Sequence, residues 1–498
     1  MLFSELIKGQ AHLATGGNLN IPVKGIAYDS RRVEPGFVFV AVPGFKTDGH
    51  LFVEQALARG AVAVVIQKDM VLPEGLAFMR VTDSRLALAL LSARFYGEPS
   101  RKLQLMGVTG TNGKTTTTHL LAAIYRAAGE KTGLIGTIAS WIGGRRLPVE
   151  HTTPESLDLQ QLLARMVADG VGVAAMEVSS HALALKRVAG CRFTAGVFTN
   201  ITRDHLDFHR DMDDYLRAKA LLFQGLEEGA VAVINGDDPR SGQVMAVTRV
   251  PCYTYGLGEG VQVRAREINV TSRGVSFALN GPWGEARVNL KLTGYFNVYN
   301  SLAALTTAAA RGVPLSLAVQ ALETVTGVPG RCELVDRGQD FTVVVDYAHT
   351  PDGLDNILKT ARQFTAGRLI TVFGCGGDRD RTKRPLMGEI AARLSDLAVV
   401  TSDNPRTEDP LRIIADVEEG VRRVRADYVV IPDRREAIRR AVAGAAAGDT
   451  VVIAGKGHED YQIIGTARYP FDDRKEAARA IEEVLSRRKV HHEKHDRG

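Results

Sequence analysis

An apolar run is joined to a helical run by Gly107-Val108-Thr109-Gly110-Thr111-Asn112-Gly113-Lys114-Thr115-Thr116, the arrangement of a strand, a loop and a helix. Glycines between a strand and a helix let backbone N–H groups surround phosphate oxygens, and the helix start favours negative charge. Lys114 would neutralise the β- and γ-phosphates, and the Thr115 hydroxyl would ligate Mg²⁺. The strict loop pattern would place glycine where Val108 stands, so this is a variant with its glycine at Gly110. A glycine-rich turn without a ligand is the alternative, but the intact Gly-Lys-Thr favours nucleotide binding.

Apolar strand-like runs alternate with helical patterns along most of the chain, which predicts α/β domains. Many of these runs end in polar residues or glycine. The positions are Glu177, Thr199-Asn200, Asp346, Gly374, Asp403 and Gly455. Open parallel sheets bind ligands beyond the carboxyl ends of their strands. We therefore expect a central P-loop domain with a parallel sheet and a Rossmann-like C-terminal domain, which could close over a shared ligand.

The chain has 498 residues, which at ~150 residues per domain predicts about three domains. Gly/Pro clusters at 96–100 and 326–330 would interrupt helices. They divide the chain into domains at 1–98, 99–330 and 331–498. The last dozen residues, 487–498, are strongly polar and are expected to form a frayed tail.

The composition excludes several classes of protein. Hydrophobic residues make up 45% and charged residues 24%, and the net charge is only +5, so no broad basic face for nucleic acid is expected. The four cysteines are scattered without a CxxC pair, which argues against a zinc ribbon or a disulfide scaffold. With no signal-peptide pattern and no apolar run near ~20 residues, we expect a cytoplasmic protein that is not inserted in a membrane.

Two positions suit a metal ion. Glu177 follows a predicted strand, and an ionised carboxylate suits a hard cation. His205 offers an imidazole ligand within the polar run 200–209. Each could be a solvated loop residue instead. A nearby phosphate loop favours the metal, because nucleotide chemistry needs charge neutralisation. Lys219, by contrast, reads as a surface helix lysine from composition alone.

Four motifs together resemble the Mur ligase family, ATP-dependent amide-forming enzymes of peptidoglycan precursor synthesis. They are 110–116 (GTNGKTT), 177–181 (EVSSH), 200–207 (NITRDHLD) and 330–333 (GRCE). Two more, 374–380 (GCGGDRD) and 403–406 (DNPR), resemble its diaminopimelate-adding branch. The motifs occur in order across all three predicted domains, so the resemblance covers the whole chain.

The resemblance implies roles for individual residues. Lys114, Glu177, His205 and Lys219 would be catalytic, and Thr115, Glu177, His205 and Lys219, the last as a carbamate, would hold Mg²⁺. The groups expected to bind ATP are Gly110, Thr111, Asn112, Gly113, Lys114, Thr115, Thr116, Asn297, Asn300, Arg331, Asp346 and His349. Those for the UDP-linked substrate are Ser30, Phe45, Lys46, Thr47, Thr152, Thr153, Ser179 and Arg187. Those for diaminopimelate are Arg379, Asp403, Asn404, Pro405, Arg406, Gly455 and Glu459.

The implied reaction adds meso-diaminopimelate to the D-Glu γ-carboxylate of UDP-N-acetylmuramoyl-L-Ala-D-Glu, through an acyl phosphate formed from ATP. The expected partners are these three substrates, without nucleic acid, and we expect the chain to act as a monomer. Two positions depart from the family pattern: His151 stands where Asn is frequent, and Leu185 where Gln is frequent. Leu185 cannot make a polar contact and is left out of the site.

Three alternatives remain open at this point. The amino acid could be L-lysine. The chain could resemble folylpolyglutamate synthase, which shares the central ATP-binding layout but would not explain the first domain with Asp29-Ser30-Arg31. The third alternative is a nucleotide-dependent switch, which would not explain the third sheet domain with its own basic motif.

Overall fold

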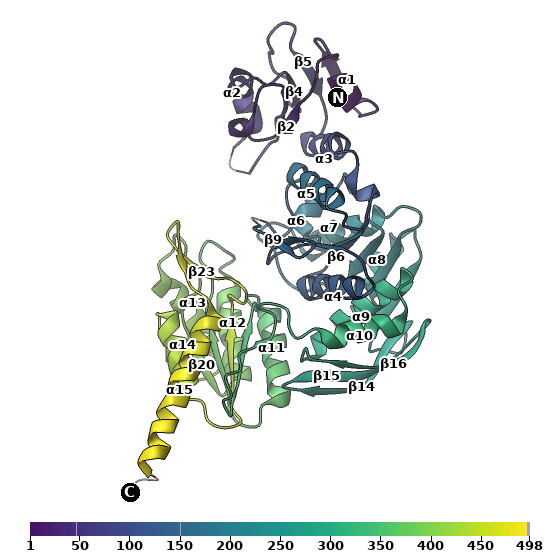
Figure 1. The fold of residues 1–498 in the computed structure, drawn as a ribbon. Helices are drawn as coiled ribbons and strands as arrows, with labels where there is room; N and C mark the ends of the chain where they lie inside the picture. Colours follow the sequence, from purple (N-terminus) through teal and green to yellow (C-terminus); the bar gives the residue numbers. More distant parts are fainter. Residues whose placement is uncertain (46, 150, 496–498) are drawn as a thin grey trace.

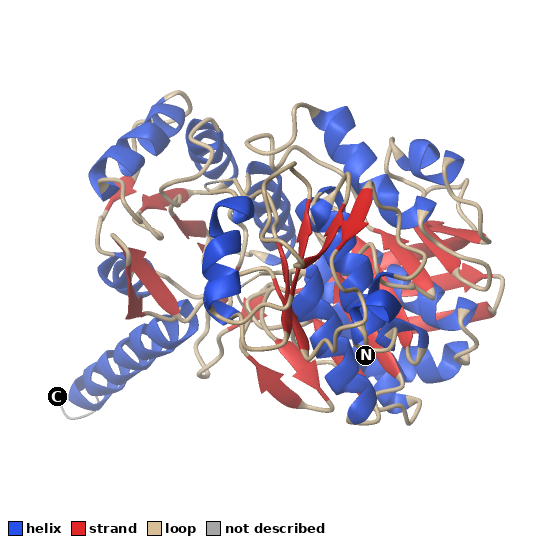
Figure 2. Cartoon of the chain, turned by 90° about the horizontal axis from the view of Figure 1, so that it is seen from above, coloured by secondary structure: helices blue, strands red, loops and turns tan. Residues whose placement is uncertain are grey.

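The computed structural model describes residues 1–45, 47–149 and 151–495. Lys46, one of the candidate substrate-binding residues, lies outside the described residues. Three main sheets follow one another along the chain and define three units, which are arranged as separate lobes (Figure 1). Seen from above, helices flank the sheets (Figure 2). The chain is therefore an α/β protein, as the alternating pattern predicts.

The first unit has a five-stranded sheet of order β1-β5-β4-β3-β2, parallel except for β1. Its strands are β1 (Ala14–Gly16), β2 (Gly25–Ala27), β3 (Phe37–Val40), β4 (Ala63–Ile66) and β5 (Ala77–Arg80). Its helices are α1 (Phe3–Ile7), α2 (Val53–Ala58) and α3 (Ser84–Phe95), with 3-10 turns η1 (Ser30–Arg32), η2 (Gly49–Phe52) and η3 (Pro99–Arg101). Buried residues pack on both faces of this sheet, so the unit has its own core.

The central unit has an eleven-stranded sheet of order β16-β15-β14-β13-β12-β11-β6-β10-β7-β8-β9. The consecutive strands β14-β13-β12-β11-β6-β10-β7 of this order are parallel. Antiparallel strands extend the sheet at both edges, β15 and β16 at one and β8 and β9 at the other. The strands are β6 (Gln104–Thr109), β7 (Thr132–Ile135), β8 (Ser140–Ile142), β9 (Arg145–Leu147), β10 (Val173–Glu177), β11 (Ala195–Phe198), β12 (Val231–Asn235), β13 (Cys252–Gly256), β14 (Val263–Thr271), β15 (Gly274–Gly281) and β16 (Gly284–Leu290). The helices are α4 (Lys114–Ala127), α5 (Ser156–Ala168), α6 (Ser180–Ala184), α7 (Met212–Gln224), α8 (Ser241–Ala246), α9 (Tyr295–Ala310) and α10 (Leu315–Thr324).

Strand β6 shows why the central sheet is covered on both sides. Its successive side chains point to opposite faces. Met106 and Val108 join the core under α4, α9 and α10, whereas Leu105 joins the core under α5 and α7. Because β10 and β11 flank β6, their carboxyl ends bring Glu177 and Thr199 beside the phosphate loop.

The third unit has a six-stranded sheet of order β17-β18-β22-β19-β20-β21, parallel except for β17. The strands are β17 (Glu333–Leu334), β18 (Thr342–Asp346), β19 (Leu369–Phe373), β20 (Leu397–Val400), β21 (Val429–Val430) and β22 (Thr450–Ala454), followed by the hairpin β23 (Tyr461–Ile464) and β24 (Ala467–Pro470). The helices are α11 (Pro351–Phe364), α12 (Lys383–Leu394), α13 (Pro410–Arg422), α14 (Arg434–Ala443) and α15 (Asp473–His495). The chain passes between sheets at 95–104 and 324–333, and the predicted limits at 98 and 330 lie in these connections.

The end of the chain differs from the prediction. Helix α15 continues through residues 487–495, where a frayed tail was expected, and extends away from the third unit (Figure 1). Its amino-terminal part packs against the third sheet through Ala477 and Ile481. Propagating a helix costs far less than starting one, and this segment contains two Arg and two Lys residues, which favour helix. The polar composition therefore does not end the helix, and Arg488 still contacts the third unit at Asp340 and at the Phe341 ring.

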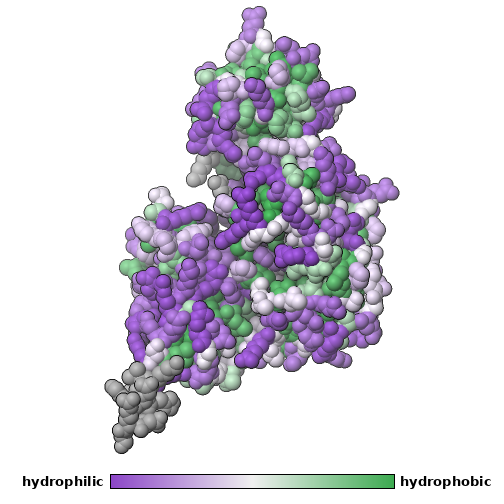
Figure 3. Space-filling model, viewed as in Figure 1, coloured by the Kyte–Doolittle hydropathy of each residue, from purple (hydrophilic) through white to green (hydrophobic). Residues whose placement is uncertain are grey.

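The surface mixes hydrophobic and hydrophilic residues, as the overall composition of the chain predicts. On the face shown in Figure 3, hydrophobic residues are interspersed among hydrophilic ones over all three units. Within the described part of the chain, no helix combines the length and hydropathy that crossing a bilayer requires.

Candidate active site

The phosphate loop joins β6 to α4 and needs glycine at two positions. Gly110 has φ +149°, and a Cβ there would lie 1.8 Å from Thr199 Oγ1. Gly113 has φ +88°, and a Cβ would lie 2.4 Å from Asn300 Oδ1. Larger residues would therefore be strained and would also collide with β11 or α9. The variant loop is built around these two glycines.

Lys114 begins α4 and folds back over this loop. Its Nζ donates to the carbonyl oxygens of Gly110 at 3.0 Å and Thr111 at 2.8 Å. Burial lowers the pKa of the Lys114 amine, while Glu177 and Asp204 work in the opposite direction. Thr111 and Thr116 are buried, and Asn112 lies at the tip of the loop, where its backbone N–H donates to Asn200.

Glu177 lies at the end of β10, in direct contact with the start of α4. Its Oε2 accepts from the Thr115 hydroxyl at 3.0 Å and from the Thr137 hydroxyl at 3.1 Å. Its Oε1 accepts from the Thr137 backbone N–H at 2.9 Å. A hydroxyl and a carboxylate oxygen side by side are hard ligands of the type that Mg²⁺ prefers. The donor set of Thr115 and Glu177 therefore fits this cation.

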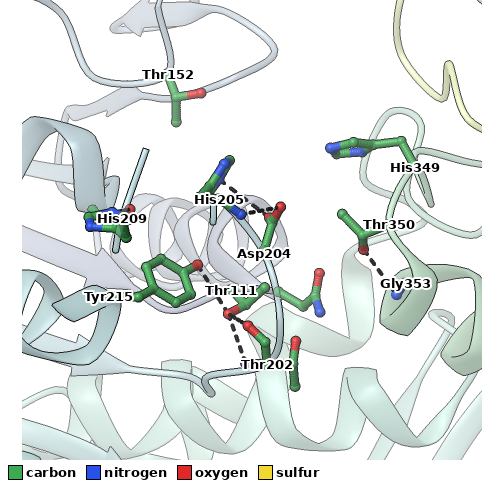
Figure 4. A network of polar contacts seen from close by, with 12 residues as sticks. Thr111, Thr152, Thr202, Asp204, His205, His209, Tyr215, His349, Thr350 and Gly353 are labelled. Carbon is green, nitrogen blue, oxygen red and sulfur yellow. Dashed lines mark hydrogen bonds and ion pairs between the residues drawn. The ribbon is translucent and has the colours of Figure 1, made fainter. Parts of the chain in front are cut away.

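His205 lies in a different group of side chains. Its Nε2 is 3.3 Å from Asp204 Oδ2, and its ring stacks edge-on against His181 with 4.8 Å between centroids. Burial lowers the pKa of His205 to about 3, although Asp204 raises it. Figure 4 shows Asp204 and His205 between Thr152 and His349. Across the described ranges, no three His, Cys, Asp or Glu side chains are gathered closely enough to hold a metal ion.

Lys219 on α7 is almost fully buried, so it is not the surface lysine that composition suggests. It is 1% exposed, its Nζ donates to the Gly110 carbonyl at 2.7 Å, and it lies 4.4 Å from the Tyr215 ring centroid. Tyr215 also connects to the phosphate loop through Thr111, at 3.2 Å between hydroxyls (Figure 4). Burial, reinforced by repulsion from Lys114, lowers the pKa of the Lys219 amine well below its ordinary value. This environment favours the neutral form of the amine.

A cavity of about 430 Å³ adjoins the phosphate loop between the central and third units. Asn112, Gly113, Thr116, Asn300, Arg331 and Asp346 are among its lining residues. Asn297 lies behind it, where its Oδ1 accepts from Asn300 Nδ2 at 3.1 Å. His349 is not part of this lining; it lines a second cavity instead.

Two residues of the third unit reach the phosphate loop. Arg331 Nη2 donates to Thr115 Oγ1 at 2.9 Å, and its guanidinium lies 4.8 Å from the Tyr347 ring centroid. Asp352 Oδ2 accepts from Asn112 Nδ2 at 2.5 Å and from the Thr202 hydroxyl at 3.1 Å. Sequence reasoning missed Asp352. Its available signal was Thr350-Pro351, the start of a helix directly after a strand.

The second cavity, of about 390 Å³, contains nearly all the candidate diaminopimelate residues. Arg379, Asp403, Asn404, Arg406, Gly455 and Glu459 line it, together with His349 of the third unit and with His181, Asp204 and His205 at the central-unit side. Pro405 is not part of its lining. The cavity therefore runs from the carboxyl ends of the third sheet to the Asp204–His205 pair.

Charges of both signs lie at the third-unit end of this cavity. Arg406 has φ +52°, and its Nη1 donates to the Gly377 carbonyl at 2.8 Å. Burial raises the pKa of Glu459, as does Asp403, and Lys456 opposes this. Lys456, which sequence reasoning also missed, is fully buried and donates to both Asn404 and Glu459, at 3.0 and 3.1 Å. Its signal was a lysine between two glycines directly after a strand.

The candidates for the UDP-linked substrate fall into two groups. Thr153, Ser179 and Arg187 lie together: the Thr153 hydroxyl donates to the Glu177 carbonyl, and its own carbonyl accepts from Arg187 at 3.0 Å. Thr152 adjoins them through Thr137 at 3.1 Å. The second group belongs to the first unit and comprises Ser30, which is buried and donates to Gln55 at 2.7 Å, Thr47, which is exposed, and Phe45.

Phe45 connects the first unit to the central unit. Its side chain is 76% exposed, yet its ring lies edge-on against Phe208 of the central unit, 5.9 Å between centroids. Phe208 stacks in turn on His181, whose ring lines the second cavity.

The chain belongs to the Mur ligase family. Three family regions match in order: the catalytic domain region at residues 22–96, the middle domain at 108–308 and the glutamate ligase domain at 330–457. It is therefore an ATP-dependent, amide-forming ligase.

Relatives over nearly the full length carry a more particular name. UDP-N-acetylmuramoyl-L-alanyl-D-glutamate–2,6-diaminopimelate ligase of Syntrophomonas wolfei is 49% identical over 484 residues, covering 97% of this chain and 99% of the relative. The ligase of the same name from Geobacillus thermodenitrificans is 51% identical, covering 94% and 96%. A solved structure of a ligase of this name has a TM-score of 0.71 at 36% identity and covers 97% of this chain and 99% of its own.

Folylpolyglutamate synthase of Mycobacterium tuberculosis, solved with ADP, shares the fold at a TM-score of 0.63 and 21% identity. It covers only 74% of this chain.

Proposed function

We propose that this chain joins meso-diaminopimelate to the D-Glu γ-carboxylate of UDP-N-acetylmuramoyl-L-Ala-D-Glu, with conversion of ATP to ADP and phosphate. The observation that carries the proposal is the charge arrangement of the second cavity, whose third-unit lining includes both arginines (Arg379 and Arg406) and carboxylates (Asp403 and Glu459). The far end of diaminopimelate bears a carboxylate and an ammonium on one carbon. Full-length similarity to ligases of this name supports the assignment.

Arg406 and Arg379 would receive the distal carboxylate, because a planar guanidinium can hold a carboxylate through two hydrogen bonds. Glu459 and Asp403 would receive the distal ammonium. This orientation points the other amine along the cavity to Asp204 and His205. Burial raises the pKa of Asp204, but His205 and His349 outweigh it and hold that pKa below its ordinary value, so the carboxylate is ionised beside the amine.

ATP would lie over the phosphate loop, with its phosphates against Lys114 and the backbone of residues 110–116, and its nucleoside toward Asn300 in the first cavity. Arg331 and Asp346 of the third unit would complete this site, and Asn297 would hold Asn300 in place. His349, which lines the second cavity, would approach the nucleotide from that side. The Thr115 hydroxyl and Glu177 would hold Mg²⁺, with His205 and carbamylated Lys219 as the further proposed ligands; bound there, the cation would neutralise phosphate charge.

The UDP-linked substrate would extend from Ser30, Phe45 and Thr47 of the first unit to Thr152, Thr153, Ser179 and Arg187. Its γ-carboxylate would then reach the phosphate loop beside Glu177. There the carboxylate oxygen attacks the γ-phosphorus, ADP leaves, and an acyl phosphate forms. The amine next attacks the acyl carbon, phosphate leaves, and the amine proton passes to a nearby base.

Because the acyl phosphate is open to hydrolysis, the contacts of Arg331 and Asp352 with the central unit would also serve to exclude water. We further propose that the enzyme acts as a monomer in the cytoplasm.

The test is a substrate panel monitored by phosphate release. We expect release only when UDP-N-acetylmuramoyl-L-Ala-D-Glu and meso-diaminopimelate are both present. Release with a folate and glutamate would instead indicate a folylpolyglutamate synthase, and release without an amino acid would indicate a nucleotide switch.

A further inference from the structure

Arg384, on α12 behind the second cavity, is a fully buried arginine that the proposed function does not use. It is 0% exposed. Its guanidinium holds Glu408 through two bonds, Nη1 to Oε2 at 2.9 Å and Nη2 to Oε1 at 2.8 Å. Nη1 also donates to Asp416 on α13 at 2.8 Å. A rigid fork of donors is thus fixed between two carboxylates.

The same guanidinium connects the two loops that carry the cavity's arginines. Nη2 donates to the Gly376 carbonyl at 3.3 Å, in the loop that leads to Arg379. Glu408, two residues after Arg406, accepts from the Asp378 backbone N–H at 2.6 Å. Arg384 therefore contacts the first loop directly and, through Glu408, holds the second loop against it.

The two loops are in close contact, so a small displacement would be felt at both arginines. A Cβ at Gly377 would lie 1.9 Å from the Pro405 carbonyl, and the Thr407 hydroxyl donates to Asp378 at 2.8 Å. Arg406 itself donates to the Gly377 carbonyl. The separation of the Arg379 and Arg406 side chains thus depends on how these loops are joined.

We propose that Arg384 is a positioning residue that sets the spacing of Arg379 and Arg406 and thereby the preference for an amino acid with a second carboxylate. This inference rests on the proposed function. Arg384 does not line the cavity, so it acts only through the loops. Glu408 is its essential partner: the guanidinium lowers the pKa of that carboxyl to about 2, which keeps the pair charged.

A second arginine lies near the Arg384–Glu408 pair but does not make the same contacts. Arg381 also approaches Asp416, at 3.2 Å, but its side chain is 66% exposed and its contacts do not include Glu408. Arg381 is therefore a matched control, since it shares one carboxylate with Arg384 but not the loop contacts.

The experiment measures KM for meso-diaminopimelate, ATP and the UDP-linked substrate in wild type, Arg384→Met, Glu408→Gln and Arg381→Met. We expect Arg384→Met to raise KM for diaminopimelate by at least about 10-fold and Glu408→Gln by about 3-fold, because misplacing a positioned group weakens the contact it makes. KM for ATP should stay within about 2-fold, and Arg381→Met should resemble wild type. The diaminopimelate-to-lysine ratio of kcat/KM should fall in the first two variants.

Combination with Arg406→Ala provides a second readout. If Arg384 acts through the two loops that carry Arg379 and Arg406, adding Arg384→Met to Arg406→Ala should raise KM for diaminopimelate far less than Arg384→Met does alone, since coupled residues are not additive. The proposal would be overturned if the two substitutions raised KM for diaminopimelate independently, so that their fold-changes multiplied in the double variant. Equal rises in all three KM values of Arg384→Met would also overturn it. If Arg384→Met does not fold, Glu408→Gln decides: an unchanged KM and selectivity for diaminopimelate overturns the role. A wild type that does not use diaminopimelate would contradict the proposed function instead.

Discussion

At the scale of single residues, Lys219 shows how burial changes the chemistry of one side chain. Its amine is enclosed beside Tyr215 and the phosphate loop, and its pKa is lowered well below the ordinary value, first by burial and then by Lys114. Only a neutral amine reacts with CO₂, and the carbamate formed is an anion. The site therefore favours the reaction and would gain a carboxylate beside the phosphate loop.

We expect Lys219→Ala to be nearly inactive, with partial recovery in the presence of short carboxylic acids. As the pH falls through the lowered pKa, the amine becomes protonated and the carbamate is lost, so activity should fall with it. The measurement is the carbamate carbon signal by NMR in ¹³C-bicarbonate, beside the rate. Lys291→Ala, at an exposed lysine, is the control. A fully active Lys219→Ala enzyme would exclude the role.

Lys114→Ala should abolish ADP formation without unfolding the protein. The Lys114 amine donates hydrogen bonds to two loop carbonyls, which are not part of a hydrophobic core, whereas a cation positioned at the transferring phosphoryl group is worth on the order of several kcal/mol of barrier. Steady-state ADP release and a thermal melt check this. Near-normal turnover in a folded variant would show that the phosphate-loop assignment is wrong.

At the scale of elements, a buried ion pair joins α14 to α15. Arg434 and Asp473 are both 0% exposed and 2.7 Å apart, and Arg434 also donates to the Ala454 carbonyl at the end of β22. Arg434→Met would leave Asp473 buried and unpaired, so we expect a loss of about 3–5 kcal/mol in stability of the third unit. Arg434→Met with Asp473→Leu should recover much of it. Denaturant unfolding is the measurement, and a single variant as stable as the exposed-pair control Arg439→Met would contradict the account.

Local pattern predicted the elements well but not the contacts between them. Polar residues at strand ends, such as Glu177 and Asp403, were identified because the hydrophobic pattern of neighbouring residues predicts where strands and helices alternate. Lys383-Arg384 looks like a solvated pair in sequence, yet Arg384 is buried between carboxylates far along the chain. The helix extending to His495 was missed for a different reason: polarity predicts exposure, not the loss of helix.

The β23–β24 hairpin is another element whose purpose lies outside its own sequence. The Arg406 backbone N–H donates to the Ile463 carbonyl at 3.1 Å, and Gly465 donates back to the Arg406 carbonyl at 2.7 Å. These bonds hold Arg406 at its positive φ, a conformation costly for a residue other than glycine. The sequence names Arg406 by resemblance but gives no indication of what fixes it.

At the scale of the whole molecule, the candidate site is assembled from all three units. Strand-end patterns suggested that the central and third units share a ligand, but no local pattern relates Asn112 to Asp352, 240 positions apart. Glu177, the phosphate loop and Lys219 were placed together by the parallel order of β10, β6 and β11. The predicted set of site residues was incomplete where the central and third units meet, since it lacked Asp352.

Arg331 provides a test of that meeting. Because its guanidinium reaches Thr115 across the units, we expect Arg331→Met to lower kcat/KM for ATP by about 10²–10³-fold with an unchanged melting temperature. Arg337→Met, at an exposed arginine in the same unit, should behave as wild type. If Arg331→Met and Arg337→Met are equally active, contact between the units does not contribute to the reaction.

The second cavity is proposed to select an amino acid with a distal carboxylate, and a comparison of two amino acids in two forms of the enzyme tests this selection. The measurement is kcat/KM for meso-diaminopimelate and for L-lysine, in wild type and in Arg406→Ala, with the reaction monitored by ADP release. Leaving a buried charge unpaired costs ~2–5 kcal/mol, so wild type should prefer diaminopimelate by roughly 30- to 5000-fold, and Arg406→Ala should lose most of that preference. Equal use of lysine by the wild type would contradict the account.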